Sequence, residues 1–327
     1  MGHHKYDYYF GESGGCECQA PEKPARLVIG GWPARGTVFE SELFSVGYTR
    51  CRPVTDGMGP DIRSGVHVLA FPTRGVFRMH IEGEVYACDP NMVIFQNATD
   101  VFRTSHPESI GDDTTWLTLR DELVCEAVRP HDPGVDDRPG SPFPFTVGMS
   151  NPEVFLLQRA LFNEACRGPD ADRLLVEETG AMVLSAAVAA AFASRKEAPT
   201  GVRRATVRAH AEMAEGAKAF MAAHLQNRLS IDDIARHVHS SPFHLCRLFR
   251  KHTGLPIHRY LNRLRLRAAV DRLHEHRTEL AKLAVDLGFA SHSHFCDAFR
   301  REFGVPPSSM RQRLTDLRSM TEQIRVG

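Results

Sequence analysis

The sequence predicts an α+β protein in which a region of short β-strands and two helices comes first and an all-helical region follows. Three observations support this fold class. Residues from about 38 to 120 alternate between apolar and polar with a period of two, helical periodicity begins at about 151, and one helical pattern occurs twice between Ser230 and Arg313. At 327 residues, the chain is long enough to form two domains with separate cores.

The distribution of charge also separates two halves of the chain. The net charge is zero overall, but residues 200–327 hold 22 Lys and Arg against 12 Asp and Glu, which leaves 18 against 28 in residues 1–199. A C-terminal half with a net charge of +10 fits binding to a polyanion. The acidic half is then expected to have a different task.

Cysteine content and hydropathy indicate the cellular compartment of the protein. The eight cysteines are scattered, and no secretory signal segment precedes them, so a reducing cytoplasm is the expected compartment. The most apolar run, Ala181–Ala193, is too short and too rich in alanine to cross a bilayer about 30 Å thick. We expect a packed helix there and no membrane contact.

Residues 1–26 are expected to form an irregular N-terminal arm, because Gly, Pro and polar residues follow its aromatic start. Cys16 and Cys18 form a Cys-x-Cys pair within it. With histidines of the arm or Cys51 as further ligands, this pair could hold a soft metal ion or respond to thiol oxidation. A metal- or thiol-responsive regulator is therefore an alternative, and a plain arm without such chemistry is the other interpretation.

The strand region lies between about Val38 and Arg120. Its segments are short and rich in β-branched and aromatic residues, with Gly, Pro, Asn and Asp at the breaks. Many short strands at this spacing predict a barrel or jelly roll. In residues 75–83 the alternation places three polar side chains on one face, and a turn is expected near Gly83: the three are Arg78, His80 and Glu82.

Two helices are expected after a loop rich in Pro and Asp, residues 128–144. They extend from about Asn151 to Arg167 and from about Ala171 to Ser194, and both have broad apolar faces. Such helices can pack on the barrel, pair with those of a second copy, or do both. Residues 196–202 are the expected linker, and a further helix over about 203–226 leads into the repeated pattern.

Each copy of the repeated pattern, about 230–254 and about 279–304, has the form of a helix-turn-helix. In the first copy, Ser230 can cap a short helix, and a second helix starts near Ser241 and ends at Gly254. The outward face of that second helix has the spacing that a helix in a DNA major groove needs to reach base edges and phosphates. It carries Phe243, Cys246, Arg247 and Arg250.

The repeated region resembles the DNA-binding domain of the AraC/XylS family of bacterial transcription regulators. The resemblance rests on the strings SSPFHLCRLFRKHTG and GFASHSHFCDAFRREFGVPPSSMR and on the intervening helix YLNRLRLRAAVDRL, and it covers roughly the last hundred residues. It implies a cupin-like β-barrel with two dimerisation helices as the effector-binding domain over 27–195, and a DNA-binding domain over 203–327. The partners that it implies are operator DNA, a small-molecule effector, a second copy of the chain and RNA polymerase.

The resemblance also gives DNA-binding positions, carried over one residue at a time. The base-reading positions in the first recognition helix are Phe243, His244, Cys246 and Arg247, and those in the second are His292, Ser293, Cys296 and Asp297. The expected set is completed by Arg250, Lys251 and Arg300.

The expected roles of these positions differ. Arg247 can pair with guanine through two hydrogen bonds, which are worth about 1 to 3 kcal/mol of discrimination. Phe243 can pack on a thymine methyl group or complete the core of the domain. Asp297 stands where many members of the family have arginine, so it either accepts from a cytosine amino group or weakens the second unit. Cys246 and Cys296 serve as small groove-facing side chains or as a redox pair.

The helix that joins the two units, about 256–275, is expected to be about 30 Å long. Successive major-groove faces lie about 34 Å apart, so this helix suits two recognition helices in neighbouring turns of DNA. Ser308 can bond a phosphate or cap the last helix. The arginines of the joining helix are expected to contact phosphates or to form a solvated face: Arg259, Arg263, Arg265, Arg267 and Arg272.

The candidate effector site consists of Arg78, His80 and Trp116, which offer a cation, a hydrogen-bonding ring and a stacking surface. In the other interpretation, the first two face solvent and Trp116 belongs to the core. His67, His80 and His106 lack the close spacing of a cupin metal site, and the N-terminus lacks the cysteine quartet of an Ada-type repair protein. We therefore expect no cofactor, no metal ion and no enzymatic activity.

Overall fold

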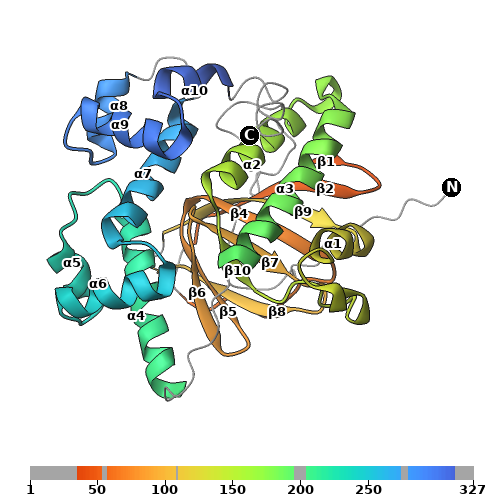
Figure 1. The fold of residues 1–327 in the computed structure, drawn as a ribbon, viewed down its shortest axis with the longest axis horizontal. Coiled ribbons are helices and arrows are strands. Elements are labelled where there is room, and N and C mark those ends of the chain that lie inside the picture. The colour runs from red at the N-terminus through yellow and green to blue at the C-terminus, as the bar shows by residue number, and fades with distance from the viewer. Residues whose placement is uncertain (1–34, 54–56, 108–109, 195–203, 274–278, 314–327) are drawn as a thin grey trace.

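The computed structural model contains two regions in contact with each other (Figure 1). It describes residues 35–53, 57–107, 110–194, 204–273 and 279–313. Strands and helices up to Ser194 form the N-terminal region, and helices from Arg204 onward form the C-terminal region. The expected arm with Cys16 and Cys18 and the expected linker lie outside the described residues.

The N-terminal region contains two antiparallel sheets. The six-stranded sheet has, in spatial order, β1 (Arg35–Glu40), β2 (Phe44–Cys51), β9 (Asp112–Leu119), β4 (His67–Gly75), β7 (Met92–Gln96) and β10 (Val147–Met149). The four-stranded sheet has β3 (Ile62–Arg63), β8 (Val101–Ser105), β5 (Phe77–Ile81) and β6 (Glu84–Cys88).

The expected barrel is not closed. Among the described strands, β1 and β10 are the edges of one sheet and β3 and β6 are the edges of the other, so the arrangement is a two-sheet sandwich. Apolar residues of both sheets form one buried cluster between them, including Val68 and Ile94 from one side and Met79 and Phe102 from the other. The turn expected near Gly83 is confirmed, since Glu82 and Gly83 join β5 to β6 with positive φ.

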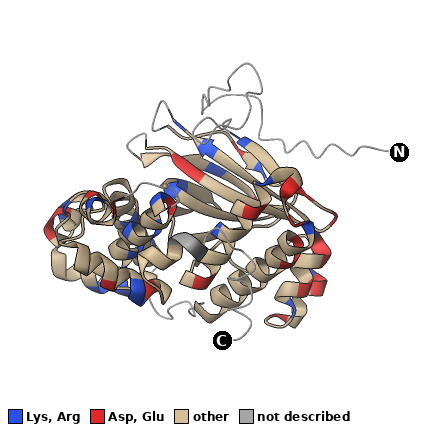
Figure 2. Ribbon diagram, turned by 90° about the horizontal axis from the view of Figure 1, so that it is seen from above, with Lys and Arg blue, Asp and Glu red and all other residues tan. Residues whose placement is uncertain are grey.

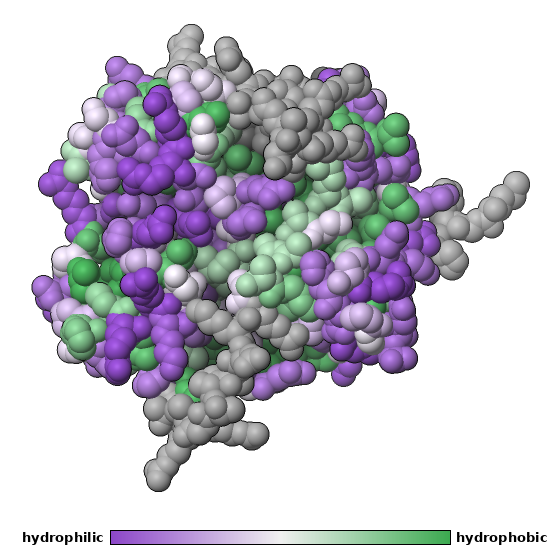
Figure 3. All heavy atoms as spheres, in the orientation of Figure 1, coloured by the Kyte–Doolittle hydropathy of each residue, from purple (hydrophilic) through white to green (hydrophobic). Residues whose placement is uncertain are grey.

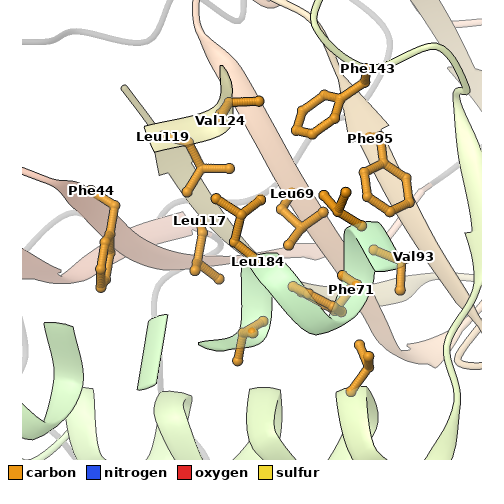
Figure 4. Close-up of a cluster of buried hydrophobic side chains, with 14 of the residues drawn as sticks. Phe44, Leu69, Phe71, Val93, Phe95, Leu117, Leu119, Val124, Phe143 and Leu184 are labelled. Atoms are coloured by element: carbon orange, nitrogen blue, oxygen red, sulfur yellow. The ribbon is translucent and has the colours of Figure 1, made fainter. Parts of the chain in front are cut away.

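Helices cover the outer face of the six-stranded sheet. They are α1 (Asp121–Val128), α2 (Pro152–Ala165) and α3 (Arg173–Ser194), and the last two match the expected helices closely. The Asn151 side chain caps α2 by accepting a hydrogen bond from the backbone N–H of Val154 at 2.8 Å. Figure 4 shows Leu184 of α3 among sheet residues of the largest buried cluster, which include Leu69, Leu117 and Leu119.

The sequence did not reveal α1, whereas α3 confirms the packed helix expected over Ala181–Ala193. Helix α1 has only eight residues, too few for helical periodicity to stand out, and it follows β9 directly before the 3-10 helix Pro133–Asp137. Helix α3 is long and apolar enough to cross a membrane by length and composition alone. Its residues Val176, Val183 and Val188 are fully buried against the sheet, as those of a core helix are.

Seven helices make up the described part of the C-terminal region. They are α4 (Arg204–Ala223), α5 (Ile231–His237), α6 (Pro242–Thr253), α7 (Ile257–Leu273), α8 (Leu280–Asp286), α9 (His292–Phe303) and α10 (Pro307–Arg313). One apolar cluster joins α4, α5 and α6 to the first part of α7, and another joins α8, α9 and α10 to its second part. Figure 1 accordingly shows the two groups of helices at opposite ends of α7.

Candidate nucleic-acid interface

The two units have matching helix ends, which confirms the duplication that the sequence predicts. Ser241 and Ser291 cap α6 and α9 by accepting hydrogen bonds from the backbone N–H three residues on. Gly254 and Gly304 end the two helices with φ of 78° and 74°, a left-handed conformation that favours glycine. Ser230 caps α5, and its side chain and that of Asp233 form a reciprocal capping box.

Helix α6 buries one face and exposes the expected DNA-binding face. Leu245, Leu248 and Phe249 are buried, so they support the helix from below. Phe243 is 82% exposed, which rules out the interpretation that it completes the core of the domain. Three of the other expected side chains on this face are exposed, namely Arg247, Arg250 and Lys251. The remaining two, His244 and Cys246, are half-buried.

Helix α9 repeats this arrangement with different chemistry. Phe295, Ala298 and Phe299 are buried, while His292, Ser293, Asp297 and Arg300 are exposed. Cys296 is half-buried, and its Sγ lies 3.4 Å from Nε2 of His292. Burial raises the pKa of the Cys296 thiol, which lowers the fraction of reactive thiolate and disfavours a redox role.

The surface around these helices suits a charged partner. Figure 2 shows Lys and Arg segments along the C-terminal helices, at the left of the view. Figure 3 shows a largely hydrophilic surface over α7 to α10, which hydrophobic atoms interrupt over α5 and α6. Exposed Ile231 and Phe243 belong to these two helices.

Two of the arginines expected to contact phosphates are buried, and that expectation was wrong for them. Arg265 donates to the backbone oxygens of Leu225 and Asn227, each at 2.8 Å. Arg267 is 1% exposed and donates to the backbone oxygens of Pro90 and Ser150 in the N-terminal region. They are buried because α7 is surrounded by neighbours on most of its circumference.

The other arginines of α7 occupy different environments. Arg263 is ion-paired to Glu302 of α9, with 2.9 Å between Nε and Oε1. Arg272 is half-buried, whereas Arg259 is exposed and keeps the expected solvated position. Ser308, expected to bond a phosphate or to cap the last helix, is exposed in the first turn of α10. Helix α7 has 17 residues, which makes it about 25 Å long and shorter than expected.

A polar cluster joins the N-terminal region to the first unit, and we call it the interdomain contact: Ala87, Asp89, Asn91, Glu215, Lys218, His252, Tyr260 and Arg267. The Tyr260 hydroxyl donates to Asp89 at 2.7 Å, and the Asn91 side chain donates to the backbone oxygen of Tyr260 at 3.2 Å. The Glu215 carboxylate of α4 accepts from the backbone N–H of Ala87 at 2.6 Å. The strands β6 and β7 and their connection therefore hold α4 and α7.

Apart from His252, the charged groups of the interdomain contact are buried, and the opposite charges compensate one another. Burial raises the pKa of Asp89 to about 6, although Lys218 and Tyr260 oppose the shift. Burial also works to raise the pKa of Glu215, but Lys218 and His252, 2.8 and 2.7 Å away, outweigh it and lower the pKa to about 2. Glu215 is therefore the fixed anion of this cluster and Asp89 the titratable one.

A second contact joins the N-terminal region to the second unit. Arg159 of α2 forms an ion pair with Asp271 of α7 at 2.8 Å. Phe155 of α2 stacks on Phe303 of α9 with ring centroids 6.1 Å apart, and the Arg267 guanidinium lies 4.7 Å from the centroid of the same Phe155 ring. Both helix-turn-helix units thus touch the N-terminal region.

The three candidate effector residues do not form one site. Trp116 packs with the cluster between the two sheets and donates from Nε1 to the Thr49 hydroxyl at 3.2 Å. Met79 and Ile81 of β5 belong to the same cluster, so the alternation along β5 places Arg78 and His80 on the opposite, outer face. The expectation of a shared pocket was wrong because the residues lie on different faces of the sandwich.

The structure brings together a group that sequence spacing did not indicate: Cys51, His106 and Asp112. They come from the end of β2, the connection after β8 and the start of β9. His67 and His80 lie elsewhere, hydrogen-bonded to the backbone oxygen of Pro139 and the Ser105 hydroxyl respectively. Only the pairing of β2 with β9 could have revealed the group.

Comparison with known proteins supports the assignment of the C-terminal region. Residues 234–313 match a family model described as a helix-turn-helix domain. The chain is 34% identical over 97 residues to the regulatory protein PocR of Salmonella typhimurium, and the aligned segment covers 30% of this chain and 32% of PocR. It is 37% identical over 87 residues to the transcriptional activator AarP of Providencia stuartii, which covers 27% of this chain and 64% of AarP.

A solved structure is also similar to part of the chain. It is a transcriptional regulator with an AraC-type DNA-binding domain from Chromobacterium violaceum, 30% identical, with a TM-score of 0.31 over 32% of this chain and 94% of that one. The chain spans about a third of the length of PocR. With two capped helix-turn-helix units in tandem and a helix-turn-helix family model matched over residues 234–313, the C-terminal region is an AraC-type helix-turn-helix domain.

Proposed function

We propose that the protein is a sequence-specific DNA-binding transcription regulator controlled by a small molecule bound in the N-terminal sandwich. One observation carries the DNA-binding part: two recognition helices of the same register expose their polar faces while their apolar faces are buried. The proposal assigns base contacts to α6 and α9 and phosphate contacts to Arg250, Lys251 and Arg300. The protein then acts in the cytoplasm on operator DNA and needs no catalysis.

The two units are expected to bind unequally. Arg247, Arg250 and Lys251 give the exposed face of α6 three cations, whereas Asp297 places a carboxylate on the equivalent face of α9. A carboxylate near phosphates weakens binding unless it accepts from a cytosine amino group. The first unit is therefore the principal anchor.

The proposed control acts through the contacts that join the two regions. An effector shifts a protein between two states only when it binds them with different affinity. The strand connection around Asp89 contacts the first unit through Tyr260, and α2 packs on α9 of the second unit. A conformational change in the sandwich would therefore alter contacts with both units. Of the three expected effector residues, Trp116 is the one that lies between the two sheets, so it is the remaining candidate for an effector contact.

Dimerisation and contact with RNA polymerase complete the proposal. The outer face of α3 is the candidate dimer surface, since Leu174 is 74% exposed there while the opposite face packs on the sheet. Sedimentation of the full chain at micromolar concentration tests this part. A monomer in the presence of operator DNA would contradict it.

Substitution of Arg247 tests the assignment of α6. Operator sequences are first selected from a random DNA pool with the full chain, and footprints are then compared. We expect Arg247→Ala to weaken operator binding and to relax the base preference at one position, because a bidentate contact worth about 1 to 3 kcal/mol is lost.

The matched control is Arg208→Ala on α4, where an exposed arginine is paired with Glu212 outside the recognition helices. It should leave both affinity and base preference unchanged. A footprint of Arg247→Ala with weaker binding but unchanged preference at every position would contradict base reading by this residue.

A further inference from the structure

Three side chains with metal-binding atoms meet at one end of the sandwich. Cys51 ends β2 and lies opposite Asp112, the first residue of β9, as the last pair of that ladder. Directly opposite residues carry their side chains on the same face of a sheet. His106, in the connection after β8, completes the group, and the potential ligand atoms all lie within 4.8 Å of one another.

Burial and hydrogen bonding organise this group. Cys51, His106 and Asp112 are all at most 9% exposed. His106 Nε2 lies 2.9 Å from Oδ1 of Asp112, and the Thr114 hydroxyl donates to Oδ2 at 2.7 Å. An outer partner of this kind fixes the orientation of a ligating carboxylate. The carboxylate is thus held with one oxygen beside the imidazole.

The neighbouring Arg52 side chain is bound outside the group. Arg52 donates to the backbone oxygens of Cys51 and Asp112 at 2.7 and 3.0 Å, and its guanidinium is paired with Asp113 at 2.6 Å. Its charge is therefore compensated by a carboxylate outside the group, and the Asp112 carboxylate is left to the imidazole and the Thr114 hydroxyl.

We propose that Cys51, His106 and Asp112 form a binding site for a divalent first-row metal ion, with Zn²⁺ as the best match. Zn²⁺ takes thiolate, imidazole and carboxylate ligands at about 2.0 to 2.3 Å, whereas Mg²⁺ and Ca²⁺ avoid sulfur. Three protein ligands leave one tetrahedral position for water or for a polar group of another ligand. Sequence spacing predicts no such site, because the three residues become neighbours only through strand pairing.

Binding changes the protonation of the group in a defined way. The Cys51 thiol releases its proton to solvent as the sulfur ligates the ion, and the His106 ring carries its proton on Nδ1 while Nε2 ligates. The hydrogen bond between His106 and Asp112 is replaced by two metal bonds.

Metal titration of the full chain tests the proposal. The reduced, chelator-stripped protein is titrated with Zn²⁺ against a chromophoric chelator, and native mass spectrometry gives the number of ions bound. We expect the wild type to bind Zn²⁺ at this site, and Cys51→Ser and His106→Ala to lower the affinity at least about 100-fold. Cys125→Ser, which changes a buried cysteine of α1, should retain it.

A double variant of the arm, Cys16→Ser with Cys18→Ser, separates this site from the other cysteine pair. Tight binding that is lost in the arm variant but kept in Cys51→Ser would overturn the proposal, as would a wild type that binds no Zn²⁺ at micromolar concentration. Operator binding is not the readout, so the result does not depend on the proposed DNA function.

Cobalt provides a measurement that does not require a variant to fold. Co²⁺ bound to the wild type should give a thiolate-to-cobalt charge-transfer band and the intense visible bands of a tetrahedral ion. The nearly isosteric Asp112→Asn and His106→Gln should weaken these bands, with circular dichroism as the check of folding. A wild-type cobalt spectrum without the charge-transfer band would also overturn the proposal.

Discussion

At the scale of single residues, burial decides what a side chain does. Arg259 and Arg267 lie two turns apart on α7 and look alike in the sequence, yet Arg259 is exposed and Arg267 is buried. The type of residue predicts a phosphate contact for both, and only tertiary packing separates them. Cys51 and Asp112 give the reverse case, since neither stands out in the sequence until the β2–β9 register brings them together.

Arg267 and Arg259 make a matched pair for testing this difference. Arg267→Ala leaves the backbone oxygens of Pro90 and Ser150 without their buried donor, so the free energy of unfolding should fall by about 3 kcal/mol. Arg259→Ala should leave the unfolding free energy unchanged and weaken binding to any DNA sequence. Urea denaturation and salt-dependent DNA titration check the pair. Equal stability of the two variants would contradict the structural role of Arg267.

At the scale of elements, local signals predicted the helices well and the sheets less well. Ser241, Ser291, Gly254 and Gly304 fix the ends of the recognition helices through capping hydrogen bonds and backbone conformation, which are written in neighbouring residues. Strand pairing has no such local signal. The alternation within β5 was therefore clear from the sequence, but the open sandwich and the opposite placement of Trp116 were not.

The caps of α9 can be tested by two substitutions at its ends. Ser291→Ala removes the acceptor for the backbone N–H of His294 and should cost about 1 kcal/mol of unfolding free energy. Gly304→Ala should cost a similar amount through its positive φ alone, because an added Cβ meets nothing within 4 Å. Gly304→Asn should lose less, since asparagine tolerates this conformation better. Stability of Gly304→Ala equal to that of the wild type in urea denaturation would contradict the strain.

At the scale of the whole molecule, the two regions are joined by contacts between buried charged groups that no sequence pattern predicts. Asp89 and Tyr260 are 171 positions apart in the chain, and Pro90 and Arg267 are 177 apart. Motifs predicted the C-terminal region because its caps and apolar stripes are written in neighbouring residues, whereas a contact of this kind depends on both regions folding first. The interdomain contact is nevertheless the part of the molecule through which the sandwich and the recognition helices can influence each other.

The interdomain contact should make stability depend on pH in two opposite ways. Folding raises the pKa of Asp89 from 3.8 to about 6, so its stabilising contribution is full below pH 3.8 and is lost as the pH rises through about 6. Folding lowers the pKa of Glu215 from 4.5 to about 2, so its contribution is full above pH 4.5 and is lost as the pH falls towards 2.

Two amide variants separate these contributions in urea denaturation between pH 3 and 8. Asp89→Asn has no titrating group at this position. The difference between its unfolding free energy and that of the wild type should therefore change in favour of the variant from pH 4 to about 6, and should be constant above pH 6. Glu215→Gln should differ from the wild type by a constant amount only above about pH 7, because the Glu215 charge contributes to the raised pKa of Asp89, which titrates below that pH. A difference for Asp89→Asn that does not change from pH 4 to 7 would show that Asp89 does not titrate within the contact.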